Sequence, residues 1–179
     1  QMEIRNRKKA KKLVSQKSDG QLFQGRRPCD SKVTASREDM RWQADLLEFS
    51  KRASSKSGNK YALTVIDLFT KECWVEVMQD KTDNETKNAM RKNIGDNNNI
   101  APAEISCDLG NEFGPAFTQY LEDQGTRVRQ KDPQQINSIA GIDRAQQSIK
   151  NILKNIQGSD GWATHIKNAV IFFNDREHG

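Results

Sequence analysis

Three aspartates that lie far apart in the chain have the residue type and the local settings to act together. They are Asp45 in the phrase WQADL, Asp108 in CDLGNEF and Asp143 in AGIDR. Carboxylates so widely separated can meet only through folding, and a site built from carboxylate oxygens suits Mg²⁺ or Mn²⁺. Paired ions of this kind serve phosphoryl transfer. The three aspartates therefore predict a divalent-metal site for chemistry on phosphodiester bonds.

The elements that would bring these residues together follow from the alternation of apolar and polar positions. Strand-like runs cover 42–49, 61–69 and 73–78, and shorter strands are expected at 103–107, ending at Asp108, and at 126–130. Helices are expected at 82–94, from 114 to 125, at 138–155 with Asp143 near its start, and at about 161–173. This order predicts an α/β protein with a mixed five-stranded sheet flanked by helices, compatible with an RNase H-like fold.

Charge divides the chain into two parts. Residues 1–33 carry ten Lys and Arg against three Asp and Glu, which gives +7, whereas the remaining residues carry nineteen against twenty-one, which gives −2. We expect a basic arm or linker at 1–36 and a single folded domain at 37–179. The arm could bind phosphates, act as a nuclear address, or be only a solvated segment.

Cysteine and histidine usage and hydropathy exclude several classes of protein. The three cysteines are far apart in the sequence and odd in number, which argues against a disulfide framework and for a reducing compartment. Two histidines are too few for a His/Cys zinc module of the usual kind. No run of apolar residues approaches the length of a membrane span, so no membrane partner is expected.

The phrases around the three aspartates also occur, in the same order, in a known family. From about Val33 to its end the sequence resembles the catalytic core of retroviral and retrotransposon integrases, including those of large self-synthesising DNA transposons. The matching phrases are Trp42, Asp45 and Leu46; 61–70; Asp108, Gly110, Glu112 and Phe113; Asp143, Arg144 and Lys150; and Phe173, Asn174 and His178.

The third phrase departs from the family pattern. The third carboxylate is usually Glu, whereas this chain has Asp143, and the 34 residues between Asp108 and Asp143 are one fewer than is usual. That arrangement is closer to the pattern of mariner-type transposases. Gln146 also stands where the family often has Asn.

The resemblance implies an activity and a set of residues. It implies a DNA integrase or transposase that processes 3′ ends and transfers strands, with Asp45, Asp108 and Asp143 as catalytic ligands of Mg²⁺ or Mn²⁺, two ions being expected. It also implies DNA as partner, both element ends and target, as well as a homo-oligomer and action in the nucleus. The residues expected to contact DNA are Arg144, Gln147 and Lys150.

Several alternatives stay open at this level. Asp143 could be an ordinary first-turn helix carboxylate, and Asp132 is a rival third ligand. Asp67 is expected to be structural, and Gln147 and Lys150 could belong to a solvated helix face. The chain could be a domesticated or decayed integrase that binds DNA without catalysis, or an RNase H-like nuclease that cleaves RNA–DNA hybrids.

Overall fold

The computed structural model describes residues 33–49, 58–130, 140–156 and 161–175. Contacts within the chain divide it into two units, 1–32 and 33–179, and all of the description below concerns the second unit. Most of the expected basic arm therefore lies outside the described residues. Two other residues weighed above, Asp132 and His178, lie outside them as well.

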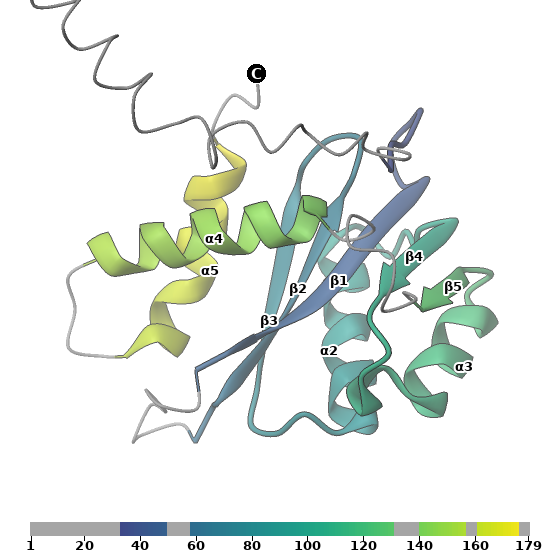
Figure 1. Ribbon diagram of the computed structural model, residues 1–179, viewed down its shortest axis with the longest axis horizontal. Helices are drawn as coiled ribbons and strands as arrows, with labels where there is room; N and C mark the ends of the chain where they lie inside the picture. Colours follow the sequence, from purple (N-terminus) through teal and green to yellow (C-terminus); the bar gives the residue numbers. More distant parts are fainter. Residues whose placement is uncertain (1–32, 50–57, 131–139, 157–160, 176–179) are drawn as a thin grey trace, which may run out of the picture. The chain divides into compact units, whose positions relative to one another are not determined.

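Five strands form one mixed sheet in the order β3-β2-β1-β4-β5 (Figure 1). β1 pairs antiparallel with β2, and β2 pairs antiparallel with β3, whereas β4 lies parallel to β1 and β5 parallel to β4. This topology confirms the expected mixed sheet and the RNase H-like arrangement. The strands are β1 (Arg41–Glu48), β2 (Tyr61–Asp67), β3 (Cys73–Met78), β4 (Glu104–Cys107) and β5 (Arg127–Gln130).

Four α-helices accompany these strands, close to their expected positions. They are α2 (Asp83–Asp96), α3 (Pro115–Asp123), α4 (Ala140–Asn155) and α5 (Trp162–Asn174). Thr82 caps α2 by accepting a hydrogen bond from the Glu85 N–H, as its sequence predicts. The helix ends at Asp96, two residues beyond its expected end at about Ile94. None of the helices described is long and apolar enough to cross a membrane.

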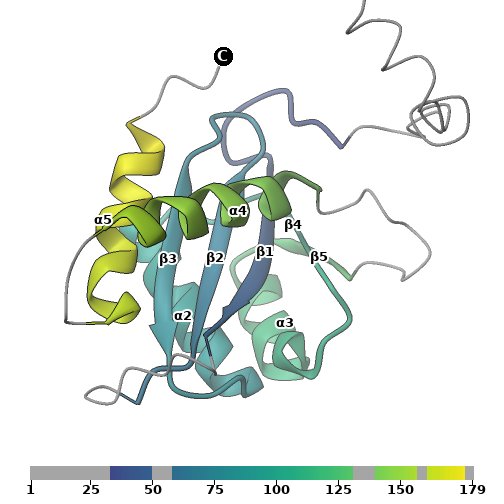
Figure 2. The same ribbon diagram turned by 60° about the vertical axis from the view of Figure 1, so that its left-hand side comes forward.

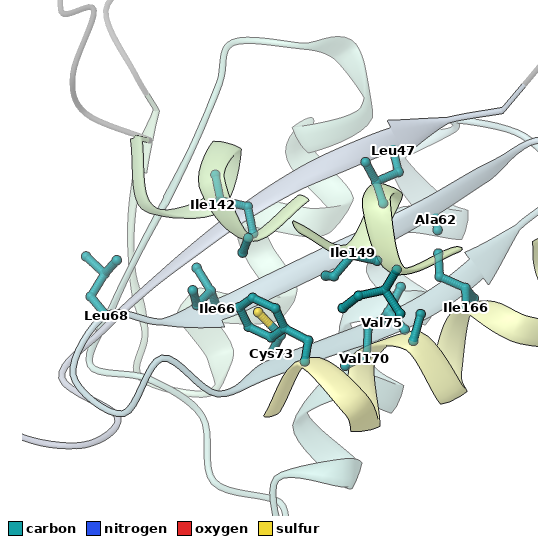
Figure 3. Close-up of a cluster of buried hydrophobic side chains, with 14 residues drawn as sticks. Leu47, Ala62, Ile66, Leu68, Cys73, Val75, Ile142, Ile149, Ile166 and Val170 are labelled. Carbon is teal, nitrogen blue, oxygen red and sulfur yellow. The ribbon is translucent and has the colours of Figure 1, made fainter. Parts of the chain in front are cut away.

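The helices cover both faces of the sheet. α4 and α5 pack on one face of β1, β2 and β3, while α2 and α3 pack on the other face (Figures 1 and 2). Figure 3 shows the first of these layers, where Ile142 and Ile149 of α4 and Ile166 of α5 meet Ile66 and Val75 of the sheet. Because it lies between two apolar layers, β2 is buried along almost its whole length.

The end of α5 is tied to the edge strand of the sheet. The Asn174 side chain accepts a hydrogen bond from the Cys73 N–H and donates one to the Cys73 carbonyl, each at 2.9 Å. It thereby satisfies the backbone groups that an edge strand leaves unpaired. This pairing gives a structural reason for the Phe173-Asn174 phrase.

Candidate active site

Asp45 lies in β1, on the face of the sheet that α4 covers. Its neighbours Trp42 and Ala44 pack on the opposite face, and side chains alternate along a strand. The carboxylate is partly buried, and its Oδ1 accepts a hydrogen bond from the Leu46 N–H at 2.8 Å. Asp45 stands opposite Thr64 of β2 in the antiparallel register.

Asp108 follows the last residue of β4. Because β4 runs parallel to β1, with Gln43 aligned to Ser106, the end of β4 brings Asp108 towards Asp45. Its Oδ1 accepts a hydrogen bond from the Gly110 N–H at 3.3 Å. A side chain at Gly110 would collide with Glu112, since a Cβ there would lie 2.5 Å from the Glu112 carboxyl group. The glycine therefore lets the Glu112 carboxylate fold back towards the loop that carries Asp108.

Asp143 lies in the first turn of α4 and is exposed. The Ile142 N–H donates a hydrogen bond to the Gln43 side-chain Oε1 at 3.0 Å, so a residue of β1 satisfies one of the unpaired N–H groups at the start of the helix. The fit is close, because a Cβ at Gly141 would lie 2.6 Å from the same oxygen and 2.8 Å from Leu68 Cδ2. Gln43 and Gly141 thus hold the turn that carries Asp143 against the strand that carries Asp45.

The charges of Asp108 and Asp143 act on the carboxyl group of Asp45. Burial above all, together with these two negative charges, raises the pKa of Asp45 from its ordinary value of 3.8 to about 6. The Leu46 N–H and the Gln146 side chain act in the opposite direction. Asp108 and Asp143 therefore lie near enough to Asp45 for their charges to affect it.

Two buried polar side chains lie beside Asp45. Gln146 is 6% exposed, and a hydrogen bond from its side-chain amide to Asp45 lowers the pKa of that carboxyl group. Thr64 faces Asp45 across the strand pair, and its Oγ1 has no hydrogen-bond partner among the described residues. An unpaired buried group is costly, so Thr64 Oγ1 marks a place adapted to something other than packing.

These residues fit a divalent cation by their chemistry. The site offers carboxylate oxygens, which suit Mg²⁺ or Mn²⁺, and a buried carboxylate with a raised pKa gains from a nearby cation. Within the part of the chain described, no three acidic, histidine or cysteine side chains lie close enough to enclose one ion as they stand. To enclose one ion, the three carboxylates would have to lie closer together than they do.

Arg144, Gln147 and Lys150 all lie on α4. Arg144 and Gln147 are exposed, Lys150 is partly exposed, and Gln147 Nε2 donates a hydrogen bond to Asn151 Oδ1 at 3.2 Å. Gln147 and Lys150 follow Asp143 at helical spacing and share its side of the helix. The arrangement leaves a polar and basic surface beside the third aspartate, and their contact with DNA stays a prediction.

Other residues considered from the sequence have structural surroundings. Asp67 is fully buried and accepts hydrogen bonds from Trp42 Nε1 and from the N–H groups of Asp39, Phe69 and Thr70. Trp42 stacks on Trp74 inside the core, with ring centroids 4.8 Å apart.

Cys107 is buried in the core beside Asp108. Burial raises the pKa of its thiol to about 12, and the charges of Asp108, Asp45 and Glu112 add to the rise. The thiol therefore stays protonated at neutral pH and is neither a nucleophile nor a thiolate ligand.

Gln43 and Gln146 belong to the site although sequence analysis did not place them there. Their spacing from Asp45 and Asp143 could have indicated that they lie beside these aspartates. Gln43 precedes Asp45 by two residues and so shares its face of β1, whereas Gln146 follows Asp143 by three and lies one turn along α4. Only the packing of α4 on β1 shows that the two amides serve one site.

The sheet is RNase H-like, and its three carboxylates lie on the central strand, after the neighbouring strand and on a covering helix. This arrangement defines a class of polynucleotide-processing cores. Within that class, residues 35–135 match the integrase core domain family, and the chain belongs to this family. No curated protein matches the chain closely enough to be reported beside it.

Solved structures of viral integrases share the fold. One is a chain in the cryo-EM structure of the simian T-cell lymphotropic virus intasome in complex with PP2A regulatory subunit B56 gamma. It has a TM-score of 0.63 and 15% identity over 80% of this chain, which spans half of that chain's length. Another is the catalytic core domain of BIV integrase, with a TM-score of 0.61 and 14% identity over 79% of this chain and 87% of that one. At such identities the likeness concerns the fold alone.

Proposed function

We propose that the chain is the catalytic core of a divalent-metal-dependent DNA integrase or transposase. The observation that carries the proposal is the environment of Asp45, a buried carboxyl group of β1 whose pKa is raised by burial and by the charges of Asp108 and Asp143 from two other parts of the chain. Strongly shifted pKa values caused by burial and by like charges are typical of functional sites. The reactions are 3′-end processing and strand transfer, both of them displacements at phosphorus.

Each residue has a distinct task in this proposal. Asp45, Asp108 and Asp143 would hold Mg²⁺ or Mn²⁺, with Asp45 held most rigidly because it lies in a strand. Divalent ions bound there supply activation of the attacking hydroxyl and stabilisation of the departing oxygen. Gln43 positions the first turn of α4, and Lys150, with Arg144 and Gln147, contacts the DNA backbone.

The partners belong to the same proposal. They are DNA, as element end and as target, and further copies of this chain, with the nucleus as the place of action. Exposed apolar side chains on the last turn of α5, Ile171 at 58% and Phe172 at 57%, are suited to a contact between protein chains. An LTR-type or self-synthesising element is the proposed origin, on the resemblance of the sequence phrases.

Disintegration of a branched DNA substrate, which requires little end specificity, tests the catalytic proposal. The wild-type chain is compared with Asp143→Glu and Asp143→Asn in Mg²⁺ and in Mn²⁺. We expect activity from the wild-type chain and none from Asp143→Asn, because the amide cannot replace an anionic ligand. Equal activity of wild type and Asp143→Asn would remove Asp143 from the site.

A second candidate function is a DNA-binding domain derived from an integrase that has lost catalysis. This alternative is favoured by the third carboxylate. Asp143 is one methylene shorter than the usual Glu, and its side chain is exposed. Under this alternative the wild-type chain is inactive, and Asp143→Glu restores disintegration by extending the carboxylate. The same assay therefore separates the two functions.

A further inference from the structure

The sheet carries a second charged surface on the same face as Asp45, over β4 and β5 and beyond the part that α4 covers. Ile105 and Cys107 of β4 pack into the core with α2 and α3, and Val128 of β5 packs against the same core. Since side chains alternate along strands, Arg127 and Arg129 project from the opposite face, and both are exposed. This is the face on which Asp45 lies.

The parallel register places further charges on this face. Glu104 aligns with Arg41 of β1 on one side and with Arg127 of β5 on the other, while Ser106 aligns with Arg129. Aligned residues of paired strands point to the same face. We call Arg41, Arg127 and Arg129 the arginine face. Together with Glu104 it carries three positive charges against one negative charge.

Glu104 fixes two of the arginines in place. Its Oε1 lies 3.3 Å from Arg41 Nε, and its Oε2 lies 2.7 Å from Arg129 Nε. The Glu104 side chain is only 13% exposed, whereas that of Arg129 is 50% exposed. Both ion pairs use the Nε atoms, and among the described residues the terminal nitrogens of Arg129 have no acceptor. A guanidinium group held in this way is prepared for phosphate, which it binds through paired N–H groups.

The arginine face lies close to the three aspartates but on the other side from Lys150. Asp108 follows Ser106 by two residues, so about 7 Å of strand separates the Asp108 position from the level of Arg129. That distance matches the rise of about two base pairs along the axis of B-DNA, at roughly 3.4 Å each. Figure 2 shows α4 crossing in front of β2 and β1, and in Figure 1 the helix does not extend over β4 and β5.

We propose that the arginine face binds the phosphate backbone of DNA, independently of sequence, as a second DNA-contacting surface beside the aspartates. This inference rests on the proposed function, because it takes DNA as the molecule that binds. A reaction that joins two DNA molecules needs backbone contacts on both sides of the reacting phosphate. α4 supplies them on one side of Asp45, and β4 and β5 supply them on the other.

The experiment is DNA binding without chemistry. A fluorescein-labelled duplex of arbitrary sequence is titrated with the full chain in EDTA at several KCl concentrations, and anisotropy reports the affinity. Arg127→Ala/Arg129→Ala is compared with Lys87→Ala/Arg91→Ala, a control that removes the same charge from α2 on the opposite side of the sheet. Losing two phosphate contacts should lower the slope of log affinity against log salt by about 1.8.

Expected and contrary results differ clearly. At low salt we expect about a tenfold loss of affinity for the double arginine variant and less than a twofold loss for the control. Arg127→Ala alone, which leaves both Glu104 ion pairs intact, should lower the slope by about 0.9. An unchanged slope, an equal loss in the control, or no binding by the wild-type chain would overturn the proposal.

Failure of this surface can be told apart from failure of the proposed function. If the arginine variants lose DNA binding while the wild-type chain shows no disintegration, the surface stands and the catalytic proposal falls. If the wild-type chain is active and the arginine variants bind DNA as it does, the catalytic proposal stands and the surface falls.

Discussion

Two aspartates on adjacent strands of the same sheet have opposite surroundings. Asp67, at the end of β2, is fully buried, yet four N–H groups donate hydrogen bonds to its carboxylate. Asp45, on β1, is less buried, but one backbone N–H donates to it and two further carboxylates act on it. The extent of burial alone therefore does not explain how the surroundings of the two carboxylates differ.

The difference lies in the groups around each carboxylate. Four N–H groups donate to Asp67, and these hydrogen bonds join β2 to the segment before β1 and to the turn that follows. Asp45 accepts fewer hydrogen bonds, and burial together with the charges of Asp108 and Asp143 raises the pKa of its carboxyl group to about 6. A site that lacks positive charge in this way is suited to bind a cation, and the following predictions test this contrast.

The largest expected effect is on catalysis. Asp45→Asn should reduce disintegration activity about 10³-fold or more, because loss of a metal ligand removes several kcal/mol of transition-state stabilisation. Asp67→Asn should leave measurable activity in the fraction of protein that folds. Product formation per folded molecule, with folding checked by circular dichroism, gives the comparison. Full activity of Asp45→Asn would exclude Asp45 from the chemistry.

The next effect concerns stability, and here substitution of Asp67 should do more harm than substitution of Asp45. Asp67→Ala leaves four N–H donors without their acceptor, and we expect the free energy of unfolding to fall by about 3 kcal/mol. Urea unfolding in EDTA measures the change. Asp123→Ala on α3 serves as a control, since its carboxylate accepts only an exposed hydrogen bond from Gln119. A loss no greater than that of the control would mean that Asp67 has no structural role.

The pH dependence of stability should identify Asp45. Its folded-state pKa is raised, so the folded protein holds the proton more tightly, and stability falls as pH rises from about 4 to about 6. At pH 7.5 in EDTA, Asp45→Asn should therefore be more stable than wild type by about 3 kcal/mol. The gap should shrink towards pH 4. A variant less stable than wild type at pH 7.5 would contradict the assignment.

Metal should reverse that order. Mg²⁺ or Mn²⁺ binds the folded state and raises the melting temperature of the wild-type chain, whereas Asp45→Asn should respond little. Thermal unfolding with increasing metal at pH 7.5 measures both responses. An equal rise in melting temperature for the two proteins would place metal binding elsewhere in the chain.

The smallest effect concerns the contact between β1 and α4. Gln43→Ala removes the acceptor of the Ile142 N–H, and we expect a loss of about 1 kcal/mol together with faster hydrogen exchange at the Ile142 amide. Gln147→Ala, on the exposed side of α4, should change neither quantity. Unchanged exchange at Ile142 in Gln43→Ala would show that the start of α4 is held by other contacts.

Much of the fold could be predicted because it depends on local patterns. The runs at 61–67 and 73–78 combine β-branched and aromatic residues between turn signals, and α2 and α3 begin at recognisable capping residues, Thr82 and Gly114-Pro115. The end of α2 was predicted to within two residues. Gly95 weakens a helix without ending it, and packing of Asn93 and Ile94 allows the helix to reach Asp96 before its cap at Asn97.

The site was predicted in its acidic residues and missed in its amides. Aspartates within distinctive phrases stand out in a sequence, but a glutamine in a strand or helix looks like any polar surface residue. Gln43 and Gln146 are buried because α4 crosses β1 at that point, and nothing local to either residue shows the crossing. The 3₁₀ turn at Asn111–Phe113, which lies between Asp108 and α3, was likewise not expected.

The sequence by itself determined the order of strands and helices, the three aspartates and the family of the chain, because periodicity and short phrases are properties of neighbouring residues. Only the tertiary structure decided which aspartate is compensated and which is not. That depends on N–H donors, amides and charges contributed by segments up to about a hundred residues apart, such as Gln43 and Ile142. Long-range packing places these groups, and a carboxylate's pKa is set by the groups around it in space.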